Sequence, residues 1–400
     1  MGHEMISEPT LRNREENAAS NPESANKAAP ARRHSDCVVV GASFAGLACA
    51  TALAQAGMRV TVLEKKSDPG EKLHTTGIIV KEAVDQVRLL DGLPGEFVRR
   101  IDGVRLYAPN LKSVELTAPG YYFLATDTAR VMRWLAARAE QAGAQILYRN
   151  PFLRADRIPS GFNLGDAGTT SYLVGADGPH SRVADRFSLG RSRDFLFGIE
   201  HEFAGIDIDE PGRLHCFLDR TIAPGYIGWV VAGVDIVQVG LARRVRDENP
   251  NASRIMAAFL EKIAPRFDFR NHQPASVRAG RIPCGGVVRP SSASRVLLVG
   301  DAAGMVSPVT AGGIHTALKH GWAAGQAVAQ FLQGNRDDPS RWLVRSYPRF
   351  RTKRLLRFLF DHFQADFSFN LLLHTRPMRM AAGIIYFHRK GVFDPRSESQ

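Results

Sequence analysis

The 400-residue sequence predicts an α/β fold with an inserted, mostly antiparallel β-sheet and a helical C-terminal segment. Three observations support this prediction. Residues 36–64 place two apolar, β-branched runs around a glycine turn and an alanine-rich helix, which is typical of a Rossmann-like βαβ unit. Residues 186–277 contain short runs with the two-residue alternation of antiparallel strands. Residues 341–390 mix basic and apolar positions, as amphipathic helices do.

The first unit begins with a strand and a tight turn. Cys37 to Val40 form an uninterrupted apolar run, as expected for a strand buried on both faces of a parallel sheet. In the following turn, Gly41 permits the bend and Gly46 lets a helix pack closely against the strand. Ser43 stands where the usual fingerprint has its middle glycine, and we expect it to be tolerated because serine is small.

A helix over about Leu47 to Ala56 and a second strand over Val60 to Leu63 complete the unit, which ends at Glu64. Glu64 lies 18 positions after Gly46, where a carboxylate accepts hydrogen bonds from both hydroxyls of an adenosine ribose. Because a 2′-phosphate would be repelled there, we expect FAD or NAD and not NADP. A glycine turn without a ligand is the alternative, but it leaves the second strand and its terminal glutamate unexplained. The residues expected to contact the nucleotide are Gly41, Ser43, Phe44, Ala45, Gly46, Glu64 and Lys65.

The composition indicates a globular cytoplasmic protein. It is 44% hydrophobic and 23% charged, and the length allows two domains. The four cysteines (Cys37, Cys49, Cys216 and Cys284) are scattered, without a CxxC pair or a His/Cys cluster, so we expect reduced thiols and no metal site. No apolar stretch approaches the ~20 residues of a membrane span, and the N-terminus lacks the hydrophobic segment of a signal peptide.

The net charge of +12 is unevenly distributed. Residues 341–400 hold twelve Lys and Arg against four Asp and Glu, which is two thirds of the excess. Such a segment suits nucleic acid or an anionic membrane surface, and the nucleotide cradle favours peripheral membrane contact over nucleic acid. Helices packed on the core with a solvated basic face are an equally weighted alternative.

The pattern along the chain predicts a nucleotide-binding domain interrupted by a substrate domain. Residues 1–34 contain almost no large apolar side chains and are expected to be a disordered tail. The remaining segments are assigned as a discontinuous FAD-binding domain at 35–80, 125–185 and 278–335, a substrate domain at 81–124 and 186–277, and a basic and apolar helical segment at 336–400.

A second motif follows the strand that begins at Ser171. The chain continues through Gly175-Ala-Asp-Gly178 and opens a helix at Ser181 and Arg182. An Asp-Gly pair is ordinarily only a turn. After an apolar strand in a chain of this kind, Asp177 and the amides near Gly178 are instead expected to hold the pyrophosphate region of FAD.

A third motif follows the strand from Arg295 to Val299. Asp301 is placed to accept a hydrogen bond from a ribityl hydroxyl, and the glycine-rich entry to the helix Ile314 to Leu332 offers amides to the flavin N1/C2 region. A plain turn is the alternative. The expected flavin contacts are Gly300, Asp301, Pro308, Gly312, Gly313 and Ile314.

Two further regions are candidates for the substrate side. Tyr226 and Trp229 lie in the inserted sheet and are expected to line a pocket, with ordinary core packing as the alternative. His74, in a polar loop after Glu64, is a weak candidate for acid or base catalysis, because a lone loop histidine is usually only solvated.

With these three motifs in this order, residues 35 to about 335 resemble the flavoprotein family that includes p-hydroxybenzoate hydroxylase. The chain is most similar to the geranylgeranyl reductase branch, through Pro69-Gly70-Glu71-Lys72, Ile282-Pro283, and Gly300-Asp-Ala-Ala-Gly304 continuing to Ser-Pro-Val-Thr-Ala-Gly-Gly-Ile. It departs from that branch at His74-Thr-Thr-Gly77, where a Cys-Gly-Gly-Gly segment is common, at Val230-Val-Ala-Gly233, where Pro-Lys-Gly is usual, and at Thr128, where many relatives have arginine. The resemblance implies a glutathione-reductase-type FAD-binding domain.

The resemblance also implies a function. The leading interpretation is an FAD-dependent reductase of carbon–carbon double bonds in an apolar, isoprenoid-type substrate, with NAD(P)H or ferredoxin as electron donor. The alternative is an FAD-dependent monooxygenase acting on an aromatic or lipophilic small molecule. A halogenase is less expected because a Trp-x-Trp-x-Ile-Pro segment is absent. A flavin-binding protein without turnover is the third class.

Overall fold

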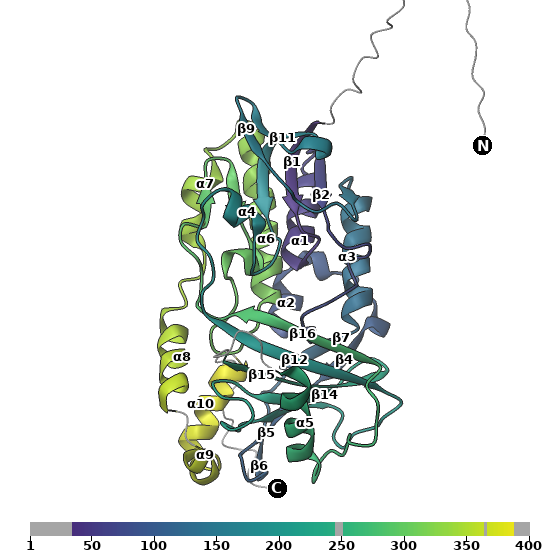
Figure 1. Cartoon of the computed structure of the whole chain (residues 1–400), viewed down its shortest axis with the longest axis vertical. Coiled ribbons are helices and arrows are strands. Elements are labelled where there is room, and N and C mark those ends of the chain that lie inside the picture. Colours follow the sequence, from purple (N-terminus) through teal and green to yellow (C-terminus); the bar gives the residue numbers. More distant parts are fainter. Residues whose placement is uncertain (1–33, 245–250, 364–365, 388–400) are drawn as a thin grey trace, which may run out of the picture.

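The computed structural model describes residues 34–244, 251–363 and 366–387. The tail expected at 1–34 lies outside these residues except for His34, which begins the first strand. The chain is built around two large sheets. In Figure 1 the upper sheet carries long helices on one face, and the second sheet lies across its lower end. The predicted α/β architecture is confirmed.

The first sheet is parallel at its centre and forms the nucleotide-binding unit. Its strands are β17 (Ser292–Ala293), β18 (Val296–Leu298), β11 (Thr169–Gly175), β1 (His34–Val40), β2 (Val60–Leu63) and β8 (Gln145–Leu147), in that order, and the hairpin β9 (Asp156–Ile158) and β10 (Gly161–Asn163) pairs with β11. Val39 lies between Val62 and Val174 in register. Strand β1 is therefore central, and the turn that follows it opens at the carboxyl edge of the sheet.

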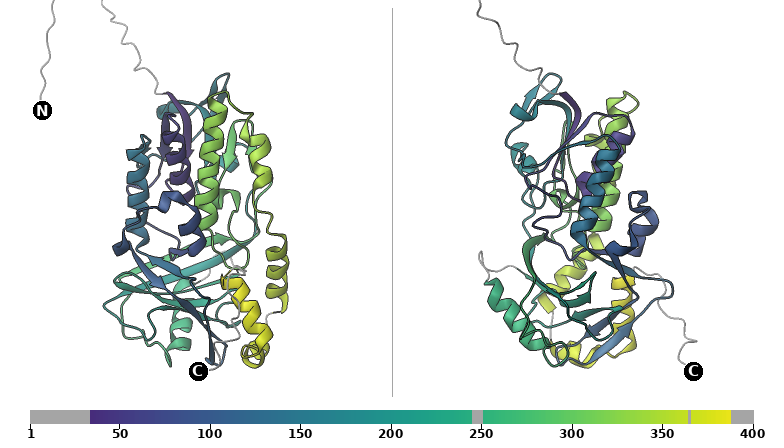
Figure 2. Two further views of the ribbon diagram at one scale, coloured as in Figure 1. Left: turned by 180° about the vertical axis from the view of Figure 1, so that it is seen from behind. Right: turned by 90° about the vertical axis from the view of Figure 1, so that its right-hand side faces the viewer.

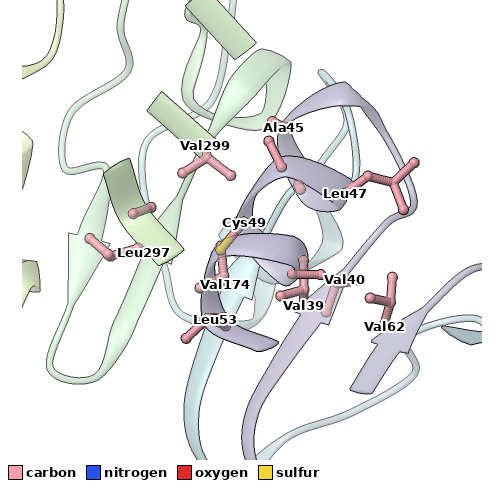
Figure 3. Close-up of a cluster of buried hydrophobic side chains, with 14 of the residues drawn as sticks. Val39, Val40, Ala45, Leu47, Cys49, Leu53, Val62, Val174, Leu297 and Val299 are labelled. Carbon is pink, nitrogen blue, oxygen red and sulfur yellow. The ribbon is translucent and has the colours of Figure 1, made fainter. Parts of the chain in front are cut away.

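Three helices pack together against this sheet: α1 (Phe44–Gln55), α3 (Thr128–Gln141) and α6 (Ile314–Leu332). Figure 3 shows Leu47 and Leu53 of α1 lying among β-branched side chains of the strands. Helix α6 approaches α1 closely because it carries glycine at the contact. A Cβ on Gly321 would lie 2.2 Å from the Ala45 carbonyl oxygen, and one on Gly325 would lie 2.4 Å from that of Cys49.

The second sheet is antiparallel apart from one parallel pair, β13 with β5. Its strands run in the order β16 (Ser276–Pro283), β12 (Phe195–Ala204), β15 (Ile236–Arg244), β14 (Gly228–Ala232), β13 (Arg213–Phe217), β5 (Gly103–Tyr107) and β6 (Ser113–Leu116). One of its buried clusters contains Met256, Phe259 and Ile263 of helix α5 (Ala252–Ile263). The sequence analysis predicted a mostly antiparallel sheet here and did not identify this helix. The apolar spacing of α5 is helical and buries a single stripe.

The boundaries between the two parts differ from the expected segments. Strand β16 was assigned to the nucleotide-binding domain from residue 278 onward, but it pairs along its length with β12 in the second sheet. Residues 81–90 were assigned to the substrate domain, yet the buried side chains of Ala83, Leu89 and Leu90 pack in the core of the first sheet. Both segments lie where the chain crosses between the sheets, and local patterning does not show which core buries them.

The crossing region also contains a small third sheet, in the order β3 (Ile78–Val80), β7 (Phe123–Thr126) and β4 (Val98–Ile101). Short helices are α2 (Lys81–Gln86), α4 (Arg182–Arg186) and α7 (Pro339–Trp342), with 3-10 turns at Arg88–Leu90, Gly95–Phe97, Gly165–Ala167, Gly300–Ala303 and Leu343–Ser346.

The chain then descends along the side of the molecule to α8 (Arg351–Phe363), α9 (Asp366–Leu372) and α10 (Arg376–Phe387), coloured yellow-green to yellow in Figure 1. Leu373 and Phe387 pack with the buried side chains of β5, β6 and β13. The second sheet is therefore covered by α5 at one of its hydrophobic clusters and by the C-terminal helices at another.

Helix α8 is anchored to the second sheet by a buried charge cluster. Asp361 of α8 accepts hydrogen bonds from Nε of Arg244 at 3.0 Å and from Nη2 of Arg357. Arg357 also donates to the carbonyl oxygen of Gly225, and its side chain is buried. The two guanidinium groups hold the pKa of Asp361 below its usual value despite burial, so this anchor is ionised at neutral pH.

Candidate functional site

The glycine turn after β1 has the close packing that a dinucleotide cradle requires. Gly41 has φ +101°, and a Cβ there would lie 2.5 Å from the Ala176 carbonyl oxygen. A Cβ on Gly46 would lie 1.9 Å from the Gly41 carbonyl oxygen. Only glycine fits at either position, as the sequence indicated.

Ser43 acts as the N-cap of α1, which begins at Phe44 and therefore three residues earlier than predicted. Its backbone is extended (φ −90°), a conformation open to any residue, which explains why glycine is not needed here. The hydroxyl accepts a hydrogen bond from the Gly46 amide at 3.2 Å and donates to the Ala176 carbonyl at 2.9 Å. The first amides of the helix, on Phe44 and Ala45, face an opening with no acidic side chain in the first turn.

Glu64 is buried at the end of β2, with both carboxylate oxygens held by main-chain amides. Oε2 accepts from Ala42 at 2.7 Å and Oε1 accepts from Lys66 at 2.9 Å. A carboxylate oxygen has a second lone pair, so each can still accept from a ribose hydroxyl. The sequence placed Glu64 and Lys65 at the nucleotide, and both line the cavity described below.

Asp177 lines the cavity and also has a local structural role, while its contact with FAD stays a prediction. Its carboxylate accepts from the Ser181 hydroxyl at 2.6 Å and from the Val183 amide at 3.2 Å, and so it fixes the start of α4. The side chain is thus occupied by protein donors. Main-chain atoms at Asp177 and Gly178 remain next to the glycine turn, since the Asp177 Cα lies 3.1 Å from the position of a Cβ on Gly41.

At the third motif, Asp301 lies in the 3-10 turn that follows β18, with Val299 as the N-cap of that turn. No described protein group donates a hydrogen bond to its carboxylate, and burial raises its pKa to about 6. Helix α6 begins nearby with Gly313 as an N-cap that provides no side-chain hydrogen bond, so its first amides are open. Gly300, Asp301, Gly312, Gly313 and Ile314 line the cavity.

Pro308 was expected to contact the flavin, but it is buried and does not line the cavity. The turn closed by the Ser307 amide and the Gly312 carbonyl at 3.0 Å places Val309 to Ile314 on the wall instead. Gly46 is likewise absent from the lining, because its role is the close helix-to-turn contact.

A single cavity of about 1580 Å³ joins the cradle to the second sheet. Pockets for one small ligand are roughly 300 to 1,000 Å³, so this cavity has room for a dinucleotide and a second ligand. Beyond the cradle the walls become apolar. This part is lined by Leu106, Phe123, Leu214, Ile227, Phe360, Phe369, Leu373, Met378, Ala381, Ala382 and Ile385.

Tyr226 and Trp229 both line this cavity, as predicted from the sequence. The Tyr226 hydroxyl donates to the carbonyl oxygen of Thr310, which ties the second sheet to the third motif. The Trp229 indole donates to Oε2 of Glu200 at 3.0 Å. Each residue also packs against neighbouring apolar side chains, so it lines the cavity and contributes to the core at the same time.

His74 also lines the cavity. Its Nδ1 lies 2.9 Å from the carbonyl oxygen of Ala279 and must donate to it, so the neutral ring leaves Nε2 as an acceptor. The loop that carries His74 is strapped to strand β16 by a second contact, from Arg278 Nη1 to the Thr75 carbonyl at 3.0 Å. A catalytic role for His74 stays a prediction.

Comparison with known proteins decides the family. A model described as an FAD binding domain matches residues 34–357. The chain belongs to this FAD-binding family. Digeranylgeranylglycerophospholipid reductase 2 of Methanopyrus kandleri is 30% identical over 78% of this chain and 81% of its own length. The digeranylgeranylglycerophospholipid reductase of Methanocaldococcus jannaschii is 26% identical over 82% of this chain and 84% of its own length.

Solved structures agree on the fold of this flavoprotein. A geranylgeranyl bacteriochlorophyll reductase-like protein from Thermoplasma acidophilum has a TM-score of 0.76 at 19% identity, covering 89% of this chain and 97% of that one. The flavin-dependent brominase Bmp2 has a TM-score of 0.67 at 15% identity, covering 88% and 94%. The chain is thus an FAD-dependent oxidoreductase of the geranylgeranyl reductase type, as its motifs predicted.

The residues of the flavoprotein fit FAD. The glycine turn leaves no space for a Cβ, Glu64 stands at the end of β2, and the open α6 N-terminus and the unpartnered Asp301 carboxylate border one cavity. We propose that the α1 turn holds the pyrophosphate, Glu64 the ribose, and Asp301 the ribityl chain.

The proposed contact between Asp301 and the ribityl chain predicts that FAD affinity depends on pH. A hydroxyl donating to its carboxylate favours the charged form, so FAD binds the deprotonated protein better than the protonated one. Affinity should therefore fall as pH drops through about 6, by about tenfold between about pH 7 and about pH 5. Fluorescence titration of the apoprotein with FAD measures this. In Asp301→Asn the dependence should flatten, and an unchanged slope in that variant would remove Asp301 from the ribityl site.

Two features of the flavoprotein were missed from the sequence. Glu200 lines the cavity from β12, and its only sequence signal is a pair of acidic residues, Glu200 and Glu202, on one face of an apolar strand. The C-terminal helices were expected to be helical, but not to wall the cavity with Phe360, Phe369 and Ile385.

Residues 34–244, 251–363 and 366–387 contain no candidate metal site and no disulfide bond. No group of three or more His, Cys, Asp or Glu side chains there could hold a metal ion. All four cysteines are free and buried, and burial raises the pKa of each thiol. Among the same residues, no helix is both long and apolar enough to cross a membrane.

Proposed function

We propose that this flavoprotein reduces carbon–carbon double bonds in the isoprenoid chains of a lipid. The observation that carries the proposal is the continuity of the cavity, which runs from the dinucleotide cradle into an apolar chamber between the second sheet and the C-terminal helices. Bound FAD, once reduced, supplies the hydride. The protein positions the cofactor and the alkene and excludes water from the space between them.

The shape and chemistry of the chamber support a long apolar substrate. Its walls come from leucine, phenylalanine, methionine and alanine side chains of two different parts of the fold. The relatives named as digeranylgeranylglycerophospholipid reductases support an isoprenoid phospholipid over a free aromatic acid. We propose NAD(P)H or ferredoxin as the electron donor.

A monooxygenase reaction is the alternative, since the same fold is found in flavin-dependent enzymes of other classes, such as a brominase and halogenases. Those structural neighbours share no more than 17% identity with the chain and support the fold alone. Oxygen consumption separates the two functions. With donor, FAD and a polyprenyl lipid, a reductase consumes donor equally with and without oxygen, whereas a monooxygenase consumes oxygen in proportion to product.

We further propose that α8, α9 and α10 rest on a membrane surface from which the substrate enters. Nine of the eleven large hydrophobic side chains exposed in the described residues lie on these helices or at their ends: Leu355, Leu356, Phe358, Leu359, Phe367, Leu371, Leu372, Met380 and Ile384. Helix α10 is apolar on two sides, with Met378 and Ile385 toward the cavity and Met380 and Ile384 exposed. Basic residues of α8 would contact anionic headgroups.

Membrane binding should depend on these apolar side chains and on salt. Phe367→Ser should lower binding to anionic vesicles by ~10-fold, because burying a phenylalanine contributes ~1.5 to 3 kcal/mol. Leu153→Ser is a matched control, since Leu153 is 77% exposed and Phe367 is 76% exposed, but Leu153 lies far along the chain from the C-terminal helices. Vesicle co-sedimentation measures both. Equal losses in the two variants, or no pelleting of the wild type, would contradict peripheral binding through these helices.

A further inference from the structure

A buried polar cluster lies in the wall of the cavity, where the loop that carries His74 and Thr75 meets the second sheet. Four strands and the loop contribute to it: Glu200 and Glu202 from β12, Trp229 from β14, Gln238 from β15, Arg278 from β16, and Thr76 from the loop. Within the cluster, Thr76, Glu200, Trp229 and Arg278 line the cavity. Glu200 therefore places a carboxyl group on the wall of the cavity that also has the apolar chamber.

The hydrogen bonds of Glu200 are unequal at its two oxygens. Oε2 accepts from the Thr76 hydroxyl at 2.5 Å and from the Trp229 indole at 3.0 Å. Oε1 has only distant neighbours, the Gln238 amide nitrogen at 3.4 Å and Arg278 Nη1 at 3.7 Å. A proton on Glu200 therefore belongs on Oε1, because Oε2 already accepts two donors.

The single nearby cation belongs to the other carboxylate. Arg278 Nη2 lies 2.6 Å from Oε1 of Glu202. The other terminal nitrogen, Nη1, lies 3.7 Å from Oε1 of Glu200. Two buried carboxylates that share one guanidinium do not both ionise readily. Burial and the charge of Glu202 raise the pKa of Glu200, against the opposing effect of Arg278 and the two donors. Other charged or titratable side chains that line the cavity include His74, whose ring is held by the Ala279 carbonyl, Arg281 of β16, and Arg357 of α8.

We infer that Glu200 is the catalytic acid that delivers the proton in double-bond reduction, an inference that rests on the proposed function. The hydride forms a C–H bond at one alkene carbon as the π bond breaks. The Oε1 proton of Glu200 forms the second C–H bond at the adjacent carbon. Glu200 is left as a carboxylate stabilised by Thr76, Trp229 and Arg278, and it regains a proton from solvent before the next turnover.

A purely structural role makes different predictions. Glu200 could serve only to hold the loop, since Thr76 is attached to the sheet through it. Glu200→Gln keeps a carbonyl oxygen that accepts from Thr76 and Trp229, so the loop attachment survives while the acidic proton is lost. Glu200→Ala removes both. A structural role leaves the first variant active and damages only the second.

The test uses the full-length FAD-loaded protein, reduced anaerobically with dithionite and mixed with vesicles of an unsaturated isoprenoid phospholipid. Wild-type reoxidation should be fast at low pH and fall as pH rises through the pKa of Glu200, because the acid must be protonated. Glu200→Gln should be slower by ~100-fold or more and should lack this pH limb. In Glu202→Gln, Arg278 is left with Glu200 alone, so the limb should move to lower pH.

A second readout does not depend on turnover. Infrared difference spectra of the apoprotein should show a protonated carboxyl band that is absent in Glu200→Gln and that titrates above the ordinary glutamate pKa of about 4.3. A wild type that is not reoxidised by the lipid would refute the proposed function. An active wild type with an equally active Glu200→Gln variant, or a missing carboxyl band, would refute only the role of Glu200.

Discussion

Replacing Gly46 with alanine is expected to remove most of the bound FAD and to lower the stability of the flavoprotein. The added Cβ would lie 1.9 Å from the Gly41 carbonyl oxygen and 3.2 Å from the Ala176 Cβ. The first contact is with main chain, which cannot rotate away, so the turn must shift. Overpacking of this kind costs ~1 to 3 kcal/mol or more and displaces the amides that face the pyrophosphate.

FAD content after purification and thermal unfolding measure the effect of Gly46→Ala. Gly212→Ala is a matched control, because no atom lies within 4 Å of its Cβ position and its φ is not in the left-handed region. That control should keep full FAD content and an unchanged melting temperature. Full FAD occupancy in Gly46→Ala would show that the turn is not the pyrophosphate cradle.

Glu64→Gln is expected to weaken FAD binding by roughly 10- to 100-fold. A hydrogen bond to a charged acceptor contributes about 1.5 to 3 kcal/mol, and the change removes the charge at the ribose site. The glutamine NH2 group also replaces one of the two oxygens that accept from the Ala42 and Lys66 amides, so one of these amides loses its acceptor.

The control for Glu64 is Glu71→Gln, which makes the same charge change at an exposed position in the following loop. FAD affinity should change less than twofold there, since exposed charges are well screened. Isothermal titration of the apoproteins gives both values. Comparable affinity losses in the two variants would mean that Glu64 acts only through the general charge of the region.

The nucleotide-binding half of the fold was predictable because its signals are local. A strand, a glycine turn, a helix and a second strand follow one another within residues 36–64, and their packing is encoded in that order. The features that the sequence did not reveal there are small and local. The N-cap hydroxyl of Ser43 starts α1 at Phe44, and the Asp177 carboxylate is taken by Ser181 and Val183.

The substrate half was less predictable because its contacts join distant segments. Glu200 meets Thr76 across 124 positions, and Arg244 meets Asp361 across 117. No periodicity in either segment identifies the partner. The apolar residues of α8 to α10 suggested either a solvated basic face or a membrane, whereas Phe360, Phe369 and Ile385 also wall the cavity. When a helix is apolar on two sides, its sequence pattern does not show which side faces the protein and which side faces another partner.

The central claim is that this chain transfers reducing equivalents from FAD to an isoprenoid double bond. The most direct measurement is a single anaerobic turnover, in which the dithionite-reduced protein is mixed with a digeranylgeranyl phospholipid. After the reaction is quenched, the mass of the lipid is measured by mass spectrometry. We predict that flavin reoxidation without oxygen accompanies lipid that has gained two hydrogens for each FAD. Reoxidation only after oxygen is admitted, with lipid that is unchanged or has gained an oxygen atom, would contradict the claim.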